Sequence, residues 1–220
     1  GSDNVLSLAI QKRVKKVVCL STDKAVYPTS AMGMTKAYME KLAMQKAADQ
    51  NRTEICVTRF GNLVASRGSA VPLFIEQVQN GMPITITDPE MTRFMMTVRE
   101  ATDLVEQAFM IGENGDLLVK RSKACTTGDL AKAVCRSLTL PANYQTEIIG
   151  IRPGEKMHEA LLTEEEAYLA RMKGDYMVVS HKREHYGILE AEYRSDLAER
   201  MSADDVLRLI ESVFEEGAER

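Results

Sequence analysis

Short apolar runs alternate with longer amphipathic stretches along the first part of the chain. The runs VKKVVCLST (14–22) and TEICVTRFGN (53–62) are rich in β-branched residues and predict strands. Each follows a stretch with apolar residues at helical spacing, NVLSLAIQKR (4–13) and GMTKAYMEKLAMQKAADQN (33–51). A helix, strand, helix, strand order is typical of a doubly wound parallel sheet, so we predict an α/β fold.

From Ser66 onward the predicted elements are shorter and more mixed. Thr126 and Asp129 have the spacing of a capping signature at a helix start. The pattern predicts helices at 68–81, 99–115, 126–138 and 202–217, and strands at 83–88, 116–121 and 146–151. We therefore predict two domains. Residues 1–65 hold part of a doubly wound sheet, and residues 66–220 form mainly a smaller α/β lobe, with some elements returning to the first sheet.

The composition excludes several classes of partner. The chain has 220 residues, of which 45% are hydrophobic and 27% charged, and its formal net charge is -4. That balance gives no basic footprint, so we expect no nucleic-acid partner. No apolar run approaches the ~20 residues that span a bilayer, and no signal peptide opens the chain. We therefore expect a cytoplasmic protein without a membrane partner.

The cysteines and histidines lack the spacing of a metal site. The four cysteines are scattered without a CxxC pair, and Cys19 and Cys56 lie inside apolar runs, which favours buried free thiols over disulfides. For His158, His181 and His185 we expect surface or packing roles, and we expect no bound metal.

Polar clusters lie at the carboxyl ends of the first two predicted strands, STDK at 21–24 and RFGN at 59–62. Ligands of doubly wound sheets bind outside the carboxyl ends of the strands, so these clusters are candidate site residues. A nucleotide-binding sheet normally opens with a strand and a G-x-G-x-x-G turn, yet glycine first clusters here at Gly61 and Gly68. We therefore expect the chain to be the carboxyl-terminal part of a longer protein, without the first half of the sheet.

Five motifs occur in a fixed order along the chain: CLSTDKAVYP, MGMTK, VTRFGNLVASRGSAVPLF, ITDPEMTRFMMTVREA and GIRPGEKMHE. In these motifs the chain resembles the extended short-chain dehydrogenase/reductases that modify nucleotide sugars. More narrowly, it resembles the inverting UDP-N-acetylglucosamine 4,6-dehydratase/5-epimerase group of bacterial capsule and O-antigen synthesis. The resemblance covers nearly the whole chain. It implies a Rossmann-type NAD(P)-binding domain truncated to residues 1–65, a lobe for a UDP-sugar substrate, a tightly bound and recycled NADP or NAD, and a homo-oligomer, either a dimer or a hexamer.

The resemblance also implies a reaction. Hydride passes from C4 of the sugar to the nicotinamide and leaves a 4-keto sugar with an acidic C5 proton. A base removes that proton, water leaves from C6 with the help of an acid, hydride returns to C6, and reprotonation from the other face inverts C5. By similarity, Asp23 is the acid, Lys24 is the base, and Thr22 bonds to the reacting sugar. An Asp–Lys pair buried beside a substrate suits acid–base work.

Most short-chain dehydrogenases carry Tyr-x-x-x-Lys, in which the tyrosine exchanges the C4 hydroxyl proton and the lysine holds the cofactor ribose. The same frame here reads MGMTK, from Met32 to Lys36. These two residues share a helix face, but methionine has no proton to exchange. We interpret Met32 as a mark of the subgroup rather than of a decayed enzyme, because the other predicted active positions are intact. The proton acceptor stays open among Lys36, Lys24, Tyr27 and a water molecule.

The other predicted site residues bind ligands by resemblance. Arg93 in MTRF and Arg152 in IRPGEK resemble two pyrophosphate clamps, a role that suits the planar fork of arginine. Glu155 would accept from the ribose hydroxyls, and Asn62 would contact the sugar or its first phosphate. The predicted sets are Lys36, Phe60, Leu63, Ser66 and Arg67 for the cofactor, and Asn62, Val71, Thr85, Arg93, Arg152 and Glu155 for the substrate.

Two other functions remain open. A UDP-sugar 4-epimerase of the same fold returns hydride to C4, and the pair of Asp23 and Lys24 argues against it because a simple epimerase needs no base at C5. An inactive fragment or a non-catalytic binding domain is the alternative from a different class, since the chain has no glycine-rich turn. The residue that distinguishes NAD from NADP is expected in the missing part of the sheet.

Overall fold

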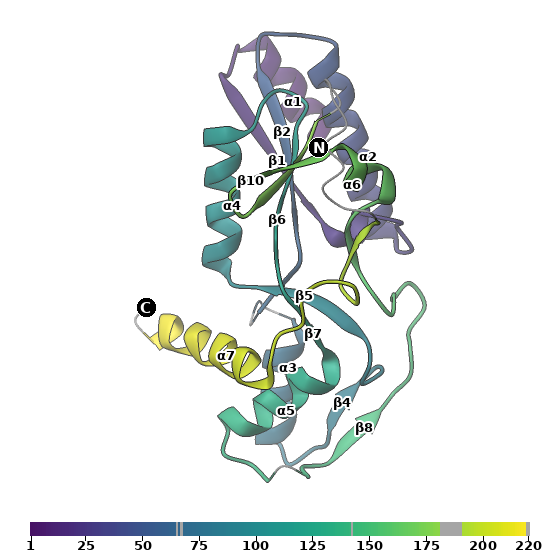
Figure 1. Cartoon of the computed structure of the whole chain (residues 1–220), viewed down its shortest axis with the longest axis vertical. Coiled ribbons are helices and arrows are strands. Elements are labelled where there is room, and N and C mark those ends of the chain that lie inside the picture. Colours follow the sequence, from purple (N-terminus) through teal and green to yellow (C-terminus); the bar gives the residue numbers. More distant parts are fainter. Residues whose placement is uncertain (65, 67, 142, 181–190, 219–220) are drawn as a thin grey trace. The chain divides into compact units, whose positions relative to one another are not determined.

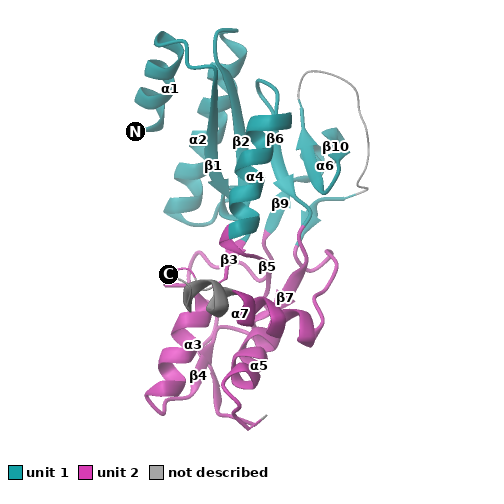
Figure 2. Ribbon diagram, turned by 90° about the vertical axis from the view of Figure 1, so that its left-hand side faces the viewer, with its two compact units in different colours: residues 1–61, 99–121, 160–194 teal, residues 62–98, 122–159, 195–220 magenta. Residues whose placement is uncertain are grey.

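The computed structural model describes residues 1–64, 66, 68–141, 143–180 and 191–218. The chain forms two compact units, which Figure 2 shows in different colours. Unit 1 comprises Gly1–Gly61, Arg99–Arg121 and Ala160–Arg194, and unit 2 comprises Asn62–Val98, Ser122–Glu159 and Ser195–Arg220. No helix in the described part of the chain is both long and apolar enough to cross a membrane.

Unit 1 is built on a five-stranded sheet with the order β1-β2-β6-β11-β10. The strands are β1 (Lys16–Thr22), β2 (Glu54–Phe60), β6 (Leu117–Lys120), β11 (Tyr176–Val179) and β10 (Ala170–Lys173). The first three run parallel, β11 is antiparallel to β6, and β10 is antiparallel to β11. The predicted α/β fold with a parallel sheet is therefore confirmed.

Helices lie on both faces of this sheet, with α2 and α4 on opposite sides (Figure 1). Side chains alternate between the faces along β2. Cys56 packs with Leu104 of α4, whereas Arg59 bonds to Glu40 of α2. The remaining elements of unit 1 are α1 (Ser2–Gln11), the 3-10 turn η1 (Asp23–Ala25), α2 (Ala31–Ala48), α4 (Val98–Ile111, which begins one residue inside unit 2), α6 (Glu164–Leu169), and the paired strands β9 (Ala160–Leu162) and β12 (Tyr193–Arg194).

Among its described residues, unit 2 combines two small sheets with three helices. Its elements are β3 (Asn62–Leu63), α3 (Ala70–Gln79), β4 (Ile84–Ile86), β5 (Thr92–Met96), β7 (Ala124–Thr126), α5 (Thr127–Ser137), β8 (Thr146–Ile148) and α7 (Ala203–Ala218). Strand β5 pairs with β3 in parallel and with β7 in antiparallel, and β4 pairs with β8 in parallel. The core includes Phe74, Leu130, Val134, Val206 and Ile210. The predicted cap is confirmed, because the Thr126 side chain accepts from the Asp129 amide at 2.9 Å.

The chain crosses from unit 1 to unit 2 after Gly61, four residues before the expected division after residue 65. Residues 99–121 and 160–194 belong to unit 1, as expected for elements that return to the first sheet. Strand β6 lies beside β2 in the large sheet. The predicted helices and strands form near their expected bounds, but β5, β7, β9, β10, β11, β12 and α6 were not predicted. The strands among them are short and carry no clear alternation, so their pairing with other segments defines them.

Candidate active site

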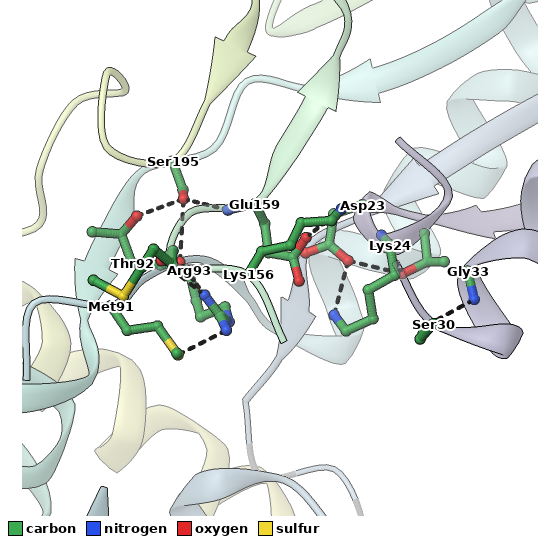
Figure 3. A network of polar contacts seen from close by, with 12 residues as sticks. Asp23, Lys24, Ser30, Gly33, Met91, Thr92, Arg93, Lys156, Glu159 and Ser195 are labelled. Atoms are coloured by element: carbon green, nitrogen blue, oxygen red, sulfur yellow. Dashed lines mark hydrogen bonds and ion pairs between the residues drawn. The ribbon is translucent and has the colours of Figure 1, made fainter. Parts of the chain in front are cut away.

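The end of β1 carries three of the predicted catalytic side chains in direct contact. Oγ1 of Thr22 and Nζ of Lys24 each donate to Oδ1 of Asp23 at 2.9 Å (Figure 3). Asp23 is 0% exposed, whereas the Lys24 side chain is 35% exposed. Oδ2 of Asp23 is buried and has no hydrogen-bond partner among the described residues. The cluster thus holds an acidic side chain inside the protein and a cationic one at its surface.

The start of α2 brings the MGMTK frame to the same strand end. Ser30 caps the helix by accepting from the Gly33 amide at 3.1 Å. Lys36, one turn further on, donates from Nζ to the backbone oxygen of Leu20 at 2.9 Å. The side chain of Met32 is 47% exposed, and it has no group that could exchange a proton.

Tyr27 was one of the open candidates for the proton acceptor. Its φ of 45° is rare for a residue with a side chain, and the residue is 52% exposed. Burial raises the pKa of its phenol above the ordinary value, although the Glu164 backbone at the first residue of α6 opposes the shift. A raised pKa makes the phenol a poorer proton acceptor at neutral pH.

A buried charge cluster holds β2 against α2 and α6. Arg59, 4% exposed, makes a bidentate pair with Glu40 at 2.9 and 2.6 Å. It also donates to Glu166 at 2.8 Å and to the backbone oxygen of Leu161 at 2.9 Å. Burial alone would raise the pKa of Glu166, but the hydrogen bonds from Arg59 hold it below its ordinary value. The next residue, Phe60, a predicted cofactor ligand, packs against the core on the α4 side.

Arg93 is the most constrained of the predicted substrate ligands in unit 2. Its Nη1 donates to the backbone oxygens of Thr92 at 2.7 Å and Met157 at 3.2 Å, and its Nη2 approaches Sδ of Met91 at 2.8 Å (Figure 3). These contacts fix the guanidinium plane before any ligand binds.

Arg152 and Glu155 lie three residues apart and bond to each other through the backbone. The Arg152 amide donates to Oε2 of Glu155 at 3.1 Å, and the Glu155 amide donates to the Arg152 carbonyl at 3.0 Å. Arg152 is exposed, and Glu155 is half-buried. The two predicted ligands are therefore neighbours on one loop, with the arginine side chain at the surface.

The other predicted ligands of unit 2 have varied surroundings. Ser66 donates to the backbone oxygen of Leu63 at 3.1 Å, and Asn62 is half-buried in β3. Oγ1 of Thr85 accepts from Gln77 at 2.7 Å. Val71 is 1% exposed, so this predicted substrate ligand packs within the core of unit 2 rather than at an open surface. Arg67 lies outside the described residues.

The cysteines are free, as predicted: Cys56, Cys125 and Cys135 are buried, and Cys19 is half-buried. Burial raises the pKa of the Cys56 and Cys125 thiols to about 12, so they are neutral and unreactive at neutral pH. Among the described residues, no three His, Cys, Asp or Glu side chains come together to hold a metal ion. His181 and His185 lie outside those residues.

Sequence reasoning missed three features that support the site. Gly33 is buried where a side chain would collide with the Lys24 carbonyl, and its place between two methionines carried no signal. Arg59 belongs to the candidate cluster RFGN, but the sequence did not show that its guanidinium is buried between Glu40 and Glu166. His158, expected at the surface or in packing, is bonded to Thr92 at 2.8 Å, and its position in GEKMHE beside the predicted ribose ligand was the available signal.

Comparisons with known proteins found a matching family and similar curated proteins. Residues 1–181 match the family described as "Polysaccharide biosynthesis protein". A curated relative named UDP-glucose 4-epimerase, from Rickettsia canadensis (strain McKiel), is 49% identical over 178 residues, which are 80% of this chain and 52% of that protein. The chain thus spans about half the length of the curated relatives it matches.

Two solved structures share the fold. The X-ray structure of Pen from Bacillus thuringiensis is 34% identical with a TM-score of 0.87, and the match covers 96% of this chain and 66% of that one. The dTDP-glucose 4,6-dehydratase from Bacillus anthracis in complex with NAD is 16% identical with a TM-score of 0.63, over 70% of this chain and 55% of that one, a likeness of fold alone. Since the family match covers most of its length, this chain belongs to the polysaccharide biosynthesis protein family.

Proposed function

We propose that this chain is part of an enzyme that converts UDP-N-acetylglucosamine to a 4-keto-6-deoxy product with inversion at C5. The observation that carries the proposal is the buried Asp23, which pairs with Lys24 through Oδ1 and keeps Oδ2 without a partner among the described residues. A buried carboxylate oxygen without a hydrogen bond is costly. Loss of the C6 hydroxyl as water needs an acid, and the carboxyl group of Asp23 is the group that would deliver the proton.

Asp23 and Lys24 together hold the proton that the departing C6 hydroxyl needs. Transfer of that proton across the 2.9 Å contact from Nζ of Lys24 to Asp23 gives a neutral amine and a carboxylic acid. The amine then takes the C5 proton, and the acid gives its proton to the departing C6 hydroxyl, so the pair regains its charged form.

Lys36 fits the role of a cofactor ligand. An ammonium group has three donors, and the bond to the Leu20 carbonyl uses one, so two remain for ribose hydroxyls. When bound, NAD or NADP would accept hydride from the sugar and return it. Met32 cannot exchange the C4 hydroxyl proton, so that exchange falls to Lys24, Lys36 or a water molecule.

We propose that Arg93 and Arg152 bind the pyrophosphate of the UDP-sugar. The fixed guanidinium of Arg93 and the exposed one of Arg152 offer planar donors that match phosphate oxygens. Glu155 uses one carboxylate oxygen for the Arg152 amide and has the other for ribose hydroxyls.

A second candidate is 4-epimerisation of a UDP-sugar. The curated relative that is 49% identical to this chain is named UDP-glucose 4-epimerase, which favours this activity. The two reactions share C4 oxidation and differ at C5, because only the dehydratase removes a proton there. The Asp23–Lys24 pair favours the dehydratase, and exchange of the C5 proton separates the two candidates.

The test follows the C5 proton in heavy water. The complete protein that contains this chain is incubated with UDP-N-acetylglucosamine, or with UDP-glucose, and NMR records the products and deuterium at C5. We expect a 4-keto-6-deoxy product from UDP-N-acetylglucosamine with deuterium at C5 in the parent. Lys24→Ala should stop both while retaining UDP-sugar binding. Lys12→Ala, at an exposed position of unit 1, is the control and should behave as the parent.

Two results would decide against the dehydratase. Interconversion of UDP-glucose and its C4 epimer without deuterium at C5 would establish the second candidate. Normal C5 exchange in Lys24→Ala would remove Lys24 from its role as the base.

A further inference from the structure

One buried side chain of unit 1 contacts three separate segments. The guanidinium of Arg59, in β2, makes two bonds to the carboxylate of Glu40 in α2. It also donates to the backbone oxygen of Leu161 in β9 at 2.9 Å and to both carboxylate oxygens of Glu166 in α6. The side chains of Arg59 and Glu40 are 5% and 7% exposed, so water competes little for these bonds. Arg59 therefore joins β2, α2, β9 and α6 at one point.

Two of the segments that Arg59 contacts, and its own strand, also adjoin the turn η1. In the pairing of β2 with β1, Arg59 lies opposite Ser21, two residues before Asp23. Helix α2 packs on η1 at Gly33, where a side chain would collide with the Lys24 carbonyl. Strand β9 also lies against η1. The positions of Asp23 and Lys24 therefore depend on how β2, α2 and β9 are held together.

The same guanidinium holds the helix that carries Lys36. Glu40 lies four residues after Lys36 in α2, so the pair of Arg59 and Glu40 fixes this part of the helix against β2. Lys36 in turn bonds to the Leu20 carbonyl at 2.9 Å, at the end of β1. Proton transfer requires groups within hydrogen-bond reach, and a misplacement of about 1 Å can cost about a hundredfold in rate. The spacing that Arg59 sets is therefore of the kind that a catalytic site requires.

Glu166 is fixed from two directions. Its Oε2 accepts from the Thr163 amide at 3.0 Å, and the Thr163 side chain accepts from the Glu166 amide at 3.2 Å. These bonds cap the start of α6. Glutamine at position 166 would turn an NH₂ group toward Arg59 or toward the Thr163 amide, and both of these can only donate. Glu166→Gln therefore loosens this end of the contact without leaving a buried charge uncompensated, because Arg59 keeps Glu40 as its partner.

We propose that Arg59 is a positioning residue for Asp23 and Lys24. Its planar guanidinium sets the spacing of β2, α2 and β9 and thereby the place of η1, a role that needs no contact with the substrate. Glu166 holds the guanidinium in this orientation. The effect on the reaction rests on the proposed function, whereas the effect on η1 does not.

The proposal separates proton transfer from substrate binding. The proposed pyrophosphate ligands Arg93 and Arg152 both belong to unit 2, whereas Arg59 and its partners belong to unit 1. Loosening the contact of Arg59 should therefore slow the steps that use Asp23 and Lys24 and leave the diphosphate contacts unchanged. Loss of an interaction that matters only in the transition state lowers kcat and leaves KM unchanged.

The first experiment reads η1 by hydrogen exchange in the complete protein that contains this chain. The Val26 amide donates to the Asp23 carbonyl at 3.1 Å and reports opening of η1. The Val57 amide, which donates to the Asp116 carbonyl at 2.9 Å, reports opening of the sheet. In Glu166→Gln, exchange at Val26 should accelerate about tenfold more than exchange at Val57.

The matched control is Glu165→Gln, at an exposed position of the same helix, and both amides should exchange in it as in the parent. Equal acceleration at Val26 and Val57 in Glu166→Gln would mean a loss of overall stability alone and would overturn the positioning role. Exchange at Val26 that stays at the parent rate would overturn it as well.

The second experiment measures turnover of UDP-N-acetylglucosamine by the complete protein. Glu166→Gln should lower kcat about ten- to hundredfold, as expected for displaced catalytic groups. Its KM should stay within about twofold of the parent value. Glu165→Gln should match the parent in both constants. A raised KM with the parent kcat, or no change in either constant, overturns the proposal.

The two proposals fail in different ways. If the parent forms the dehydrated product and Glu166→Gln forms it at the same rate, the positioning role fails and the proposed function stands. If the parent forms no dehydrated product, the proposed function fails, and exchange at Val26 and Val57 alone decides whether Arg59 fixes η1.

Discussion

The backbone of Gly33 lies so close to Lys24 that a Cβ atom at position 33 would lie 2.3 Å from the Lys24 carbonyl oxygen. The first turn of α2 is thereby packed directly on η1. The close approach explains how Lys36, one turn later on α2, reaches the end of β1 and bonds to the Leu20 carbonyl. Glycine is the residue whose lack of a Cβ permits this approach.

Gly33→Ala should therefore destabilise the protein. A methyl group forced against a backbone carbonyl is an overpacking change, which lowers the free energy of unfolding by about 1–3 kcal/mol. This loss opposes the gain of about 1 kcal/mol that alanine brings to a helix interior. Urea unfolding measures the net effect, with Met34→Ala at a 56% exposed position as the control. A Gly33→Ala protein as stable as the parent would show that the close approach to the Lys24 carbonyl does not limit stability.

The buried charges around Arg59 predict how the free energy of unfolding depends on pH. The substitution Arg59→Met should reverse that dependence. In the parent, the lowered pKa of Glu166 means that its contribution to stability is present above the ordinary glutamate value of about 4.3. That contribution is lost as the pH falls through the lowered value. Arg59→Met leaves Glu40 and Glu166 buried without a counter-charge, so the variant should lose about 3–5 kcal/mol near neutral pH.

The variant should then recover stability as the pH falls, because uncompensated buried carboxylates bind protons more tightly in the folded state. Unfolding free energies of both proteins between about pH 3 and about pH 8 test the opposite slopes. Lys132→Met, which removes an exposed ion pair with Asp129, is the control and should leave the slope unchanged. Parallel slopes for Arg59→Met and the parent would contradict the assignment.

Substitutions in the MGMTK frame separate a working site from a decayed one. Met32→Ala should lower turnover of UDP-N-acetylglucosamine only modestly, because this half-exposed side chain transfers no proton. Lys36→Ala should be far more damaging, since it removes the proposed ribose contact and a candidate proton acceptor. Met32→Tyr need not help, because another group handles the C4 proton. Turnover by the complete protein is the measurement, and an inactive parent that Met32→Tyr restores would mean that the enzyme has decayed.

The two proposed phosphate ligands should respond differently to truncation. Arg152→Ala removes an exposed side chain, so it should weaken UDP-sugar binding by about 1.5–3 kcal/mol with little change in unfolding. Arg93→Ala also releases the backbone oxygens of Thr92 and Met157, so it should reduce binding and stability together. Calorimetric affinity and urea unfolding of both variants test this contrast. An affinity within twofold of the parent for Arg152→Ala would rule out its role.

Local patterns in the sequence determined a large part of unit 1. Helical spacing and β-branched runs predicted α1, β1, α2 and β2 near their observed bounds. The Thr126 cap was also readable, because it acts over three residues. The same holds for Thr22, Asp23 and Lys24, which are adjacent in sequence and therefore meet wherever β1 ends.

Only the tertiary structure decided which distant segments meet. Strand β6 enters the sheet beside β2, and Arg59 bonds to Glu166, 107 residues further along the chain. Nothing in the local sequence of His158 shows that Thr92 and Ser195 lie against it. Periodicity and capping act within one or two turns, whereas these pairings depend on which surfaces bury each other when the whole chain packs. The sum of all contacts in the fold decides between alternative packings. A single stretch of sequence holds only a small part of those contacts.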